Sequence, residues 1–361
     1  AYFPAAKMAW LLQKNAEIRE RAESGEICLG TIDSWLLWQL TQEHVFKTDY
    51  SNASRTQLMN LQTLGWDEEL AEIFGIPMEC LPQICDSDSV FGYTLMGGLF
   101  EKPVPICAVL GDSHAALFGQ GCLLPGMSKA TYGTGSSLMM NIGEKPIASS
   151  HGVVTSLAWK RRGRVEYVLE GNLNYTGAVI TWLKEDMKLI QTAGETEELA
   201  LSANPADETY LVPAFTGLGA PYWDENARAA VIGMSRVTGK AELVRAALDC
   251  IAYQITDLIM AMEQDTGIPM KELRVDGGPT RNRYLMQFQS DISGKKLRIP
   301  AEEELSGIGA AYMAGIAAGL YQEEVLFGRE NGTEFIPEMD EMVRKQKQEG
   351  WKAAVAKVTA V

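Results

Sequence analysis

The stretch that decides the fold runs from residue 105 to residue 119 and reads PICAVLGDSHAALFG. Its first part, Ile106 to Leu110, is a short apolar run that stops at Gly111-Asp112, and a helical pattern begins at Ala115. An uninterrupted apolar run of this length predicts a central strand, because strands buried on both faces lose the polar alternation of surface strands. Ligands of open α/β sheets bind beyond the carboxyl ends of the strands. Asp112 is therefore the first candidate site residue.

Two interpretations of Asp112 carry about equal weight. A carboxylate at a strand end can accept a proton from a hydroxyl group. The same side chain can instead cap the helix that follows, since Asp is among the preferred N-cap residues. The neighbouring His114 is expected to be a structural residue, not a ligand.

Two glycine-rich turns lie farther along the chain. Residues 131–137 read TYGTGSS within a predicted strand hairpin, and residues 276–282 read DGGPTRN between a strand and a helix. Such turns let backbone N–H groups approach phosphate oxygens, and Asn282 can bond an adenine or a ribose. Each turn by itself is equally typical of a tight connection, with Asn282 as a helix cap. Together with Asp112, the two turns favour nucleotide-dependent phosphoryl transfer over a simple binding module.

The remaining pattern alternates between strands and helices, which indicates an α/β protein. We expect strand hairpins within 131–141 and 156–170 and a short strand at 273–275. Apolar residues at helical spacing predict helices at 4–21, in the second half of 28–40, and at 66–74, 241–264, 282–293, 306–320 and 337–358.

Composition excludes several classes of function. The chain has 361 residues with 32 basic and 47 acidic side chains, a net charge of −15, which argues against nucleic-acid and anionic-membrane partners. The longest weakly polar run, 307–320, is too short to span a bilayer. The six cysteines form no C-x-x-C pair, and only three histidines are present, so we expect reduced thiols, a cytoplasmic location and no metal centre built from these residues.

Several longer motifs resemble one family. They are TDYSNASRT at 48–56, GD at 111–112, TYGTG at 131–135, PAFTGLGAPYWD at 213–224, RVDGG at 274–278 and QFQSD at 287–291. The sequence carrying them resembles the FGGY carbohydrate kinases, and among these the glycerol kinase branch. The resemblance extends over essentially the whole chain.

The resemblance implies a fold and an activity. The fold is two actin-like ATPase, ribonuclease H-like domains with a catalytic cleft between them. Residues 1–120 would be the remainder of an N-terminal substrate-binding domain, and residues 121–361 a C-terminal nucleotide-binding domain. The activity is ATP-dependent phosphorylation of a hydroxyl of a small polyol or sugar, with Mg²⁺ held by the ATP phosphates near Asp112 and not by protein ligands. The resemblance also implies a homo-oligomer, a dimer.

The resemblance also implies roles for individual residues. Asp112 matches the catalytic base, and the substrate would lie against Asp112, Ser113, Ser137 and Tyr2. Ser113 and Ser137 stand where the glycerol kinase branch has Gln and Phe, so we expect a substrate that is glycerol-like or larger, such as a tetritol or a pentulose. Thr181 is the weaker match to the nucleotide site, because the branch has Gln there. The nucleotide-binding positions are Thr134, Gly135, Gly177, Thr181, Gly278 and Asn282.

One alternative belongs to another functional class. A catalytically inactive actin-like protein that binds a sugar, a nucleotide or a partner is disfavoured by the intact Asp112 and the intact loop 131–135. The family's early Asp-x-Gly-Thr-Thr-type turn and its Arg-Glu pair are not found, and the chain opens without Met. We therefore expect the C-terminal portion of a longer kinase, with little or no turnover by this chain alone.

Overall fold

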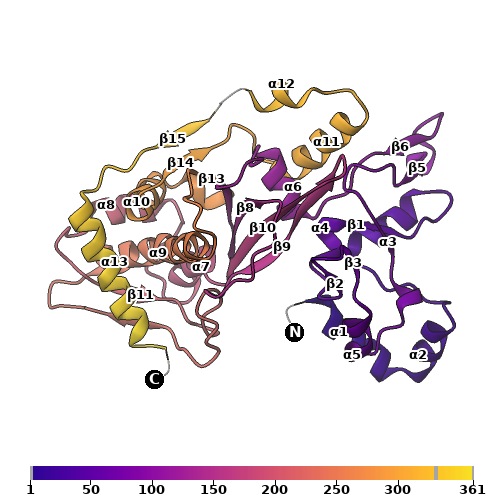
Figure 1. The fold of residues 1–361 in the computed structure, drawn as a ribbon. Helices are drawn as coiled ribbons and strands as arrows, with labels where there is room; N and C mark the ends of the chain where they lie inside the picture. The colour runs from indigo at the N-terminus through magenta and orange to yellow at the C-terminus, as the bar shows by residue number, and fades with distance from the viewer. Residues whose placement is uncertain (1–2, 329–331, 360–361) are drawn as a thin grey trace.

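A computed structural model describes residues 3–328 and 332–359 and has a seven-stranded sheet at its centre (Figure 1). The strand order is β15-β14-β13-β7-β8-β10-β9; β13 runs parallel to β14 and β7, and the other neighbouring pairs are antiparallel. The strands are β7 (Met127–Tyr132), β8 (Ser136–Gly143), β9 (Val154–Arg161), β10 (Arg164–Leu173), β13 (Glu272–Asp276), β14 (Lys296–Ile299) and β15 (Thr333–Phe335).

Helices cover both faces of this sheet. On β8, Leu138 and Met140 pack into one apolar cluster and Met139 packs into another, as the two-residue period of a strand requires. The larger cluster includes side chains of α7 (Gly177–Glu185), α8 (Glu195–Ser202), α9 (Lys240–Thr266), α10 (Arg283–Ser293) and α13 (Glu341–Ala356). The smaller cluster includes side chains of α6 (Asp112–Gly119) and α11 (Leu305–Ala317). The pair β11 (Tyr210–Val212) and β12 (Ala230–Ile232) adds Leu211 and Val212 to the larger cluster, and α12 (Glu323–Phe327) packs against the smaller one.

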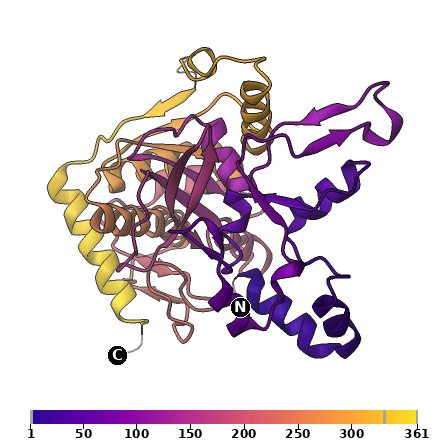
Figure 2. The same ribbon diagram turned by 45° about the vertical axis from the view of Figure 1, so that its right-hand side comes forward.

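The segment before α6 forms a smaller unit beside the β9 edge of the sheet (Figures 1 and 2). Its own core is small and includes Leu12, Leu58 and Cys80. Its helices are α1 (Pro4–Lys14), α2 (Ala16–Glu23), α3 (Ile32–Leu40), α4 (Tyr50–Ala53) and α5 (Glu68–Phe74). Its strands form three pairs: β1 (Lys47–Asp49) with β4 (Gln83–Cys85), β2 (Met59–Asn60) with β3 (Gly65–Trp66), and β5 (Gly92–Thr94) with β6 (Val104–Ile106).

The predicted central strand at 106–110 is wrong. Strand β6 ends at Ile106 and pairs with β5 in a separate hairpin. Beyond it, the N–H of Val109 donates to the carbonyl of Ser87 at 3.1 Å, and the N–H of Gly111 donates to the hydroxyl of Ser51 at 2.9 Å. A loop held by these scattered contacts, and not the end of a sheet strand, leads to α6.

The predicted helix over residues 4–21 is also corrected. Asn15 takes an extended conformation, with φ −137° and ψ 106°, and divides the segment into α1 and α2. Its side-chain oxygen accepts from the N–H of Ile18 at 3.2 Å, so it caps α2. The apolar spacing could not show this break, because the two helices bury apolar residues in one core. The hairpins within 131–141 and 156–170 and the long helix at 241–264 are confirmed.

Helix α6 packs against α11 at backbone distance. A Cβ atom added to Gly309 would lie 1.8 Å from the carbonyl oxygen of Ala115, and one added to Gly119 would lie 2.6 Å from that of Leu305. Only glycine fits at these two positions, because a side chain on either helix would push the other away. The start of α6, where Asp112 lies, is fixed by this contact.

We expect Gly309→Ala to destabilise the fold by about 2 kcal/mol or more, since the new methyl group overlaps a backbone atom that cannot rotate away. Gly307→Ala on the same helix is the matched control, because its Cβ would meet only the Glu304 side chain at an ordinary 3.6 Å. Thermal and urea unfolding of both variants measure the effect. Equal stability of the two variants would contradict the close approach.

Candidate active site

Asp112 is the first residue of α6, and its side chain is exposed. The cap position belongs to Gly111, so the interpretation of Asp112 as the N-cap residue is wrong. One carboxylate oxygen of Asp112 accepts from the N–H of Ser113 at 2.6 Å. A negative charge is favoured at this end of the helix, where the backbone dipoles present their positive ends. The carboxylate therefore lies at the surface, at the N-terminal end of the helix.

His114 lies directly behind Asp112 and is buried. Its Nε2 lies 3.4 Å from the hydroxyl of Ser156. Burial lowers the pKa of His114 to about 3, and the positive charges of Arg55 and Lys129 act in the same direction. The ring is thus neutral at physiological pH, which agrees with the expected structural role.

A buried ammonium group underlies the loop 131–137. Lys129 of β7 is fully buried, and its Nζ donates to the hydroxyls of Thr131 at 3.0 Å and Ser137 at 3.1 Å. Burial lowers the pKa of Lys129, whereas the carboxylates of Asp276, Glu170 and Asp112 raise it. The charges of Asp276, Glu170 and Asp112 thus act on Lys129, while its Nζ holds the hydroxyls of Thr131 and Ser137.

Lys129 was not among the residues predicted from the sequence. It could have been found as a charged residue inside a strand, two positions before Thr131 and therefore on the same face of that strand. The paired Arg55 and Glu170, whose charged atoms lie 2.9 Å apart, were also missed as site residues, although Arg55 belongs to the motif at 48–56.

The loop 131–137 rests against the beginning of α7. The N–H of Gly177 donates to the carbonyl of Gly133 at 2.9 Å, and the N–H of Ala178 donates to that of Thr134 at 3.0 Å. A Cβ atom at Gly177 would lie 2.4 Å from the Gly133 oxygen, so the approach requires glycine. The fold thereby brings the predicted residues Thr134, Gly135 and Gly177 together.

Four predicted nucleotide-binding residues line one pocket of about 540 Å³: Gly177, Thr181, Gly278 and Asn282. This volume lies in the range typical of cofactor and small-molecule sites. The apolar floor and the charged rim of the pocket were not predicted. The pattern of a helix does not distinguish an apolar pocket residue from an apolar core residue. The floor includes Ile180, Leu248 and Ile251, and the rim includes Lys184, Glu197 and Arg281.

Asn282 serves as a helix cap and as a pocket residue at once. Its Oδ1 accepts from the N–H of Leu285 at 2.9 Å, which caps α10. Its Nδ2 donates to the hydroxyl of Thr196 at 3.0 Å. The two interpretations left open by the sequence are thus compatible, and the amide is held in one orientation at the pocket wall.

Gly135 and Ser137 line a neighbouring opening of about 460 Å³, together with Thr131, Asn172 and Asn174. Asp112 and Ser113 line neither this opening nor the larger pocket. Tyr2 lies outside the described residues. Four of the six predicted nucleotide-binding residues therefore line one pocket, whereas the predicted substrate-binding residues in the described part of the chain do not share one opening.

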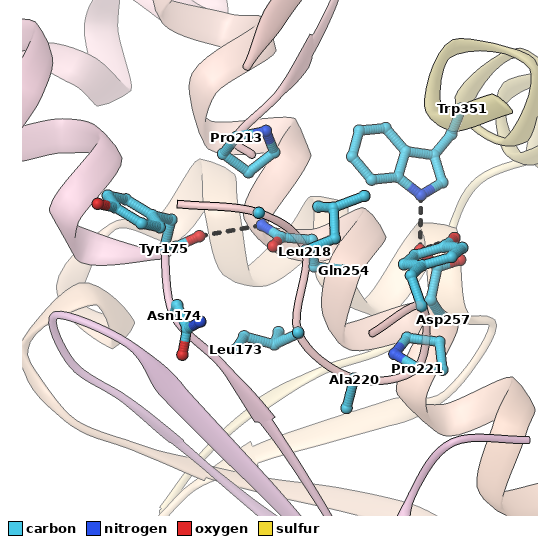
Figure 3. A pocket seen from close by; sticks show the side chains of 13 residues that line it. Leu173, Asn174, Tyr175, Pro213, Leu218, Ala220, Pro221, Gln254, Asp257 and Trp351 are labelled. Atoms are coloured by element: carbon cyan, nitrogen blue, oxygen red, sulfur yellow. Dashed lines mark hydrogen bonds between the residues drawn. The ribbon is translucent and has the colours of Figure 1, made fainter. Parts of the chain in front are cut away.

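Figure 3 shows a third cavity, which we exclude as a site. Its free volume is about 10 Å³, roughly enough for one water molecule. Trp351 of α13 and Tyr222 donate to one carboxylate oxygen of Asp257 on α9, at 2.7 and 2.9 Å. Burial raises the pKa of Asp257 to about 6, and both hydrogen bonds act against this shift. This cavity is a packing joint between α9, α13 and the loop at 217–222.

Three further features belong to the described residues. In residues 3–328 and 332–359, no group of three or more His, Cys, Asp or Glu side chains is arranged to hold a metal ion. Over the same residues, no helix combines the length and the apolar character needed to cross a membrane. The six cysteines are unpaired.

Comparison with known proteins identifies the family. Residues 1–119 match the N-terminal domain of the FGGY family of carbohydrate kinases, and residues 128–318 match its C-terminal domain. A glycerol kinase of Natranaerobius thermophilus is 45% identical over 356 residues, which are 98% of this chain and 72% of that protein. A glycerol kinase of Brevibacillus brevis is 46% identical over 357 residues, 98% of this chain and 71% of that protein.

Solved structures agree with this match. The glycerol kinase of Plasmodium falciparum with ADP has a TM-score of 0.91 and 35% identity, covering 98% of this chain and 71% of that one. A ligand-bound xylulose kinase of Lactobacillus acidophilus, at 22% identity, shares the fold with a TM-score of 0.86, covering 98% of this chain and 71% of that one. The chain belongs to the FGGY family of carbohydrate kinases, with the two-domain actin-like fold of that family.

Proposed function

We propose that this protein transfers the terminal phosphoryl group of ATP to a hydroxyl of a small polyol or sugar. The observation that carries the proposal is the convergence of Gly177, Thr181, Gly278 and Asn282 on one pocket beside the loop 131–137. The names of the relatives, glycerol kinases at about 45% identity, support the same activity. They do not support the alternative of an inactive binding protein.

Each of the two units is proposed to bind one of the two substrates. Residues 121–361 would bind the nucleotide, with the base or ribose near Asn282 and the phosphates toward Thr134 and Gly135. Residues 1–120 would hold the acceptor against Asp112. Closure of the two units on each other would exclude water, which otherwise competes as an acceptor.

Asp112 would act as the general base. A carboxylate is a weak base for an alcohol, but in a loose phosphoryl-transfer transition state the hydroxyl proton leaves late. Orientation of the hydroxyl by Asp112 therefore matters more than its basicity. Lys129 lies below the loop 131–137 and adds a positive charge to the region where phosphate charge accumulates.

Mg²⁺ fits this arrangement as an ion carried by the nucleotide. Mg²⁺ commonly binds substrate phosphates and one or two carboxylates and keeps several waters. The ATP phosphates and water would hold the ion, and the exposed carboxylate of Asp112 would lie near its water shell. When bound, the ion would neutralise part of the charge on the ATP phosphates.

The substrate is proposed to be glycerol-like or larger. Ser137 is small, its hydroxyl is oriented by Lys129, and the adjoining opening of about 460 Å³ carries the amides of Asn172 and Asn174. Additional hydroxyls of a four- or five-carbon polyol or ketose could bond to these groups. A dimeric state stays a prediction, which light scattering of the purified chain tests.

Asp112→Asn is expected to lower kcat by about 10²- to 10⁴-fold, because the amide keeps the shape but cannot accept the proton. The dissociation constant for ATP should stay within about twofold of the unmodified chain, since Asp112 does not line the larger pocket. Steady-state kinetics and calorimetric ATP titration measure the two effects. A variant with near-normal kcat would remove Asp112 from the role of base.

Asn282→Asp tests the nucleotide pocket. Asp is as good an N-cap as Asn, so α10 should persist, but the amide donor is lost and a negative charge enters the pocket. We expect the dissociation constant for ATP to rise about tenfold or more, in line with losing a hydrogen bond and gaining repulsion. Asn15→Asp, at the cap of α2, is the matched control. Unchanged ATP affinity in Asn282→Asp would place the nucleotide elsewhere.

Ser137→Phe tests the size of the substrate. The unmodified chain should show a higher kcat/KM for a tetritol or pentulose than for glycerol. The bulky ring should reverse this preference by about tenfold or more, because it fills the space used by the longer chain. Competition assays with paired substrates measure the ratio. If the unmodified chain strongly prefers glycerol over all four- and five-carbon candidates, the larger-substrate proposal is wrong.

A further inference from the structure

Asp49 is a buried carboxylate in the unit before α6. It is the last residue of β1, it is fully buried, and its side chain accepts five hydrogen bonds. Oδ1 accepts from the Ser51 hydroxyl at 2.9 Å and from the N–H and Nδ2 of Asn52 at 3.0 and 2.8 Å. Oδ2 accepts from the N–H of Ser51 at 2.9 Å and the hydroxyl of Ser87 at 2.7 Å. A carboxylate without a cation partner in hydrogen-bond contact is thus satisfied entirely by neutral donors.

The first branch of this network reaches the residue before Asp112. The hydroxyl of Ser51 has one hydrogen, which it donates to Asp49, so its oxygen is left as an acceptor. It accepts from the backbone N–H of Gly111 at 2.9 Å. Gly111 is the N-cap residue of α6 and precedes Asp112 in the chain. Two hydrogen bonds in series, from the Ser51 hydroxyl to Asp49 and from the Gly111 N–H to the Ser51 oxygen, thus form a relay that links Asp49 to the peptide before Asp112.

The second branch holds the same loop at another point. Ser87 donates its hydroxyl to Asp49, and its carbonyl accepts from the N–H of Val109 at 3.1 Å. The N–H of Ser87 donates to the carbonyl of Lys160 on β9 at 2.7 Å. Asp49 thus joins the loop at 109–111 to the edge of the central sheet, although these segments are far apart in sequence.

The loop at 109–111 depends on these hydrogen bonds, because it has no neighbouring strand to pair with. A Cβ atom at Gly111 would lie 2.9 Å from Nδ1 of His114, so the backbone at this point is closely confined. A shift of the Gly111 peptide moves the start of α6 and the side chain of Asp112 with it. A displacement of about 1 Å at a reacting group can cost about 100-fold in rate.

We propose that Asp49 is a positioning residue for Asp112, acting through the Ser51 hydroxyl on the backbone of Gly111. Asp49 touches neither substrate nor nucleotide in this arrangement. It sets the place at which the Asp112 carboxylate meets the acceptor hydroxyl. The proposal rests on the proposed role of Asp112 as the general base.

Two variants of the full chain test the relay. Ser51→Ala removes the hydroxyl that bonds Gly111 and leaves Asp49 with its other donors. Asp49→Asn keeps the shape, but its amide hydrogens must face groups that are themselves donors. Ser51→Thr keeps the hydroxyl and should restore activity. Asp67→Asn is the matched control, since Asp67 caps α5 in the same unit through the N–H of Leu70 at 3.0 Å and has no contact with the relay.

We expect Ser51→Ala and Asp49→Asn to lower kcat by about 10- to 100-fold, with KM for ATP changed less than about twofold. Misplacement of the base should also raise the ratio of ADP formed to phosphorylated acceptor, because water then competes better with the acceptor hydroxyl for the phosphoryl group. In an Asp112→Asn background, Ser51→Ala should cost less than about twofold, since the group that it positions is already lost. If Ser51 had a purely structural role, Ser51→Ala would lower kcat by the same factor in the unmodified chain and in the Asp112→Asn variant. That result would overturn the proposal.

Hydrogen exchange supplies a readout that needs no turnover. The Gly111 amide should exchange faster in Ser51→Ala and Asp49→Asn than in the unmodified chain and in Asp67→Asn. Unchanged protection of Gly111 in both variants overturns the relay. If Asp112→Asn retains normal activity, Asp112 is not the general base. The hydrogen-bond relay from Asp49 to Gly111 is then tested by hydrogen exchange alone, so failure of the base and failure of the relay are distinguishable.

Discussion

The backbone contact between α6 and α11 is the constraint on which the site depends. The seven-stranded sheet has two apolar faces, and α6 and α11 cover the smaller cluster at Met139, Trp159 and Val168. Gly119 and Gly309 let the two helices approach until backbone atoms touch. Because α6 begins with Asp112, the element that completes the core also carries the carboxylate proposed as the base. Stability and the position of this proposed base are therefore set by one packing arrangement.

Polar groups in the interior extend this arrangement into the site. Lys129 is fully buried and donates to two hydroxyls, and Asp49 is fully buried among neutral donors. Burying such groups is costly unless each finds partners, so the surrounding hydroxyls and amides have little freedom to move. Thr131 and Ser137 are fixed from the side of the sheet, and Gly111 is fixed from the smaller unit. The two sets of contacts converge on the region where phosphoryl transfer is proposed.

The two sides of the site differ in how far they could be predicted. Gly278 and Asn282 were found in a glycine-rich turn and Gly177 through the family resemblance, and the structure gathers them at one pocket. Their positions follow local rules, since a glycine turn or an N-cap is written within a few residues. Lys129 and Asp49 were missed as site residues, because their partners are brought to them by strand pairing and loop packing. The strand predicted at 106–110 failed for the same reason: an apolar run does not say whether a neighbouring strand is present to pair with it.

The sequence by itself determined the family, the α/β class, the hairpins at 131–141 and 156–170 and most helices, because periodicity and turn residues act over short distances. It also determined the identity of Asp112 as a candidate. Only the tertiary structure decided that Asp112 opens a helix after a loop, that Asn282 both caps α10 and lines a pocket, and that the buried Lys129 holds the hydroxyls of Thr131 and Ser137. These features rest on contacts between residues distant in sequence. Hydrophobic periodicity and turn residues describe only neighbouring positions, so they do not predict which distant groups come into contact.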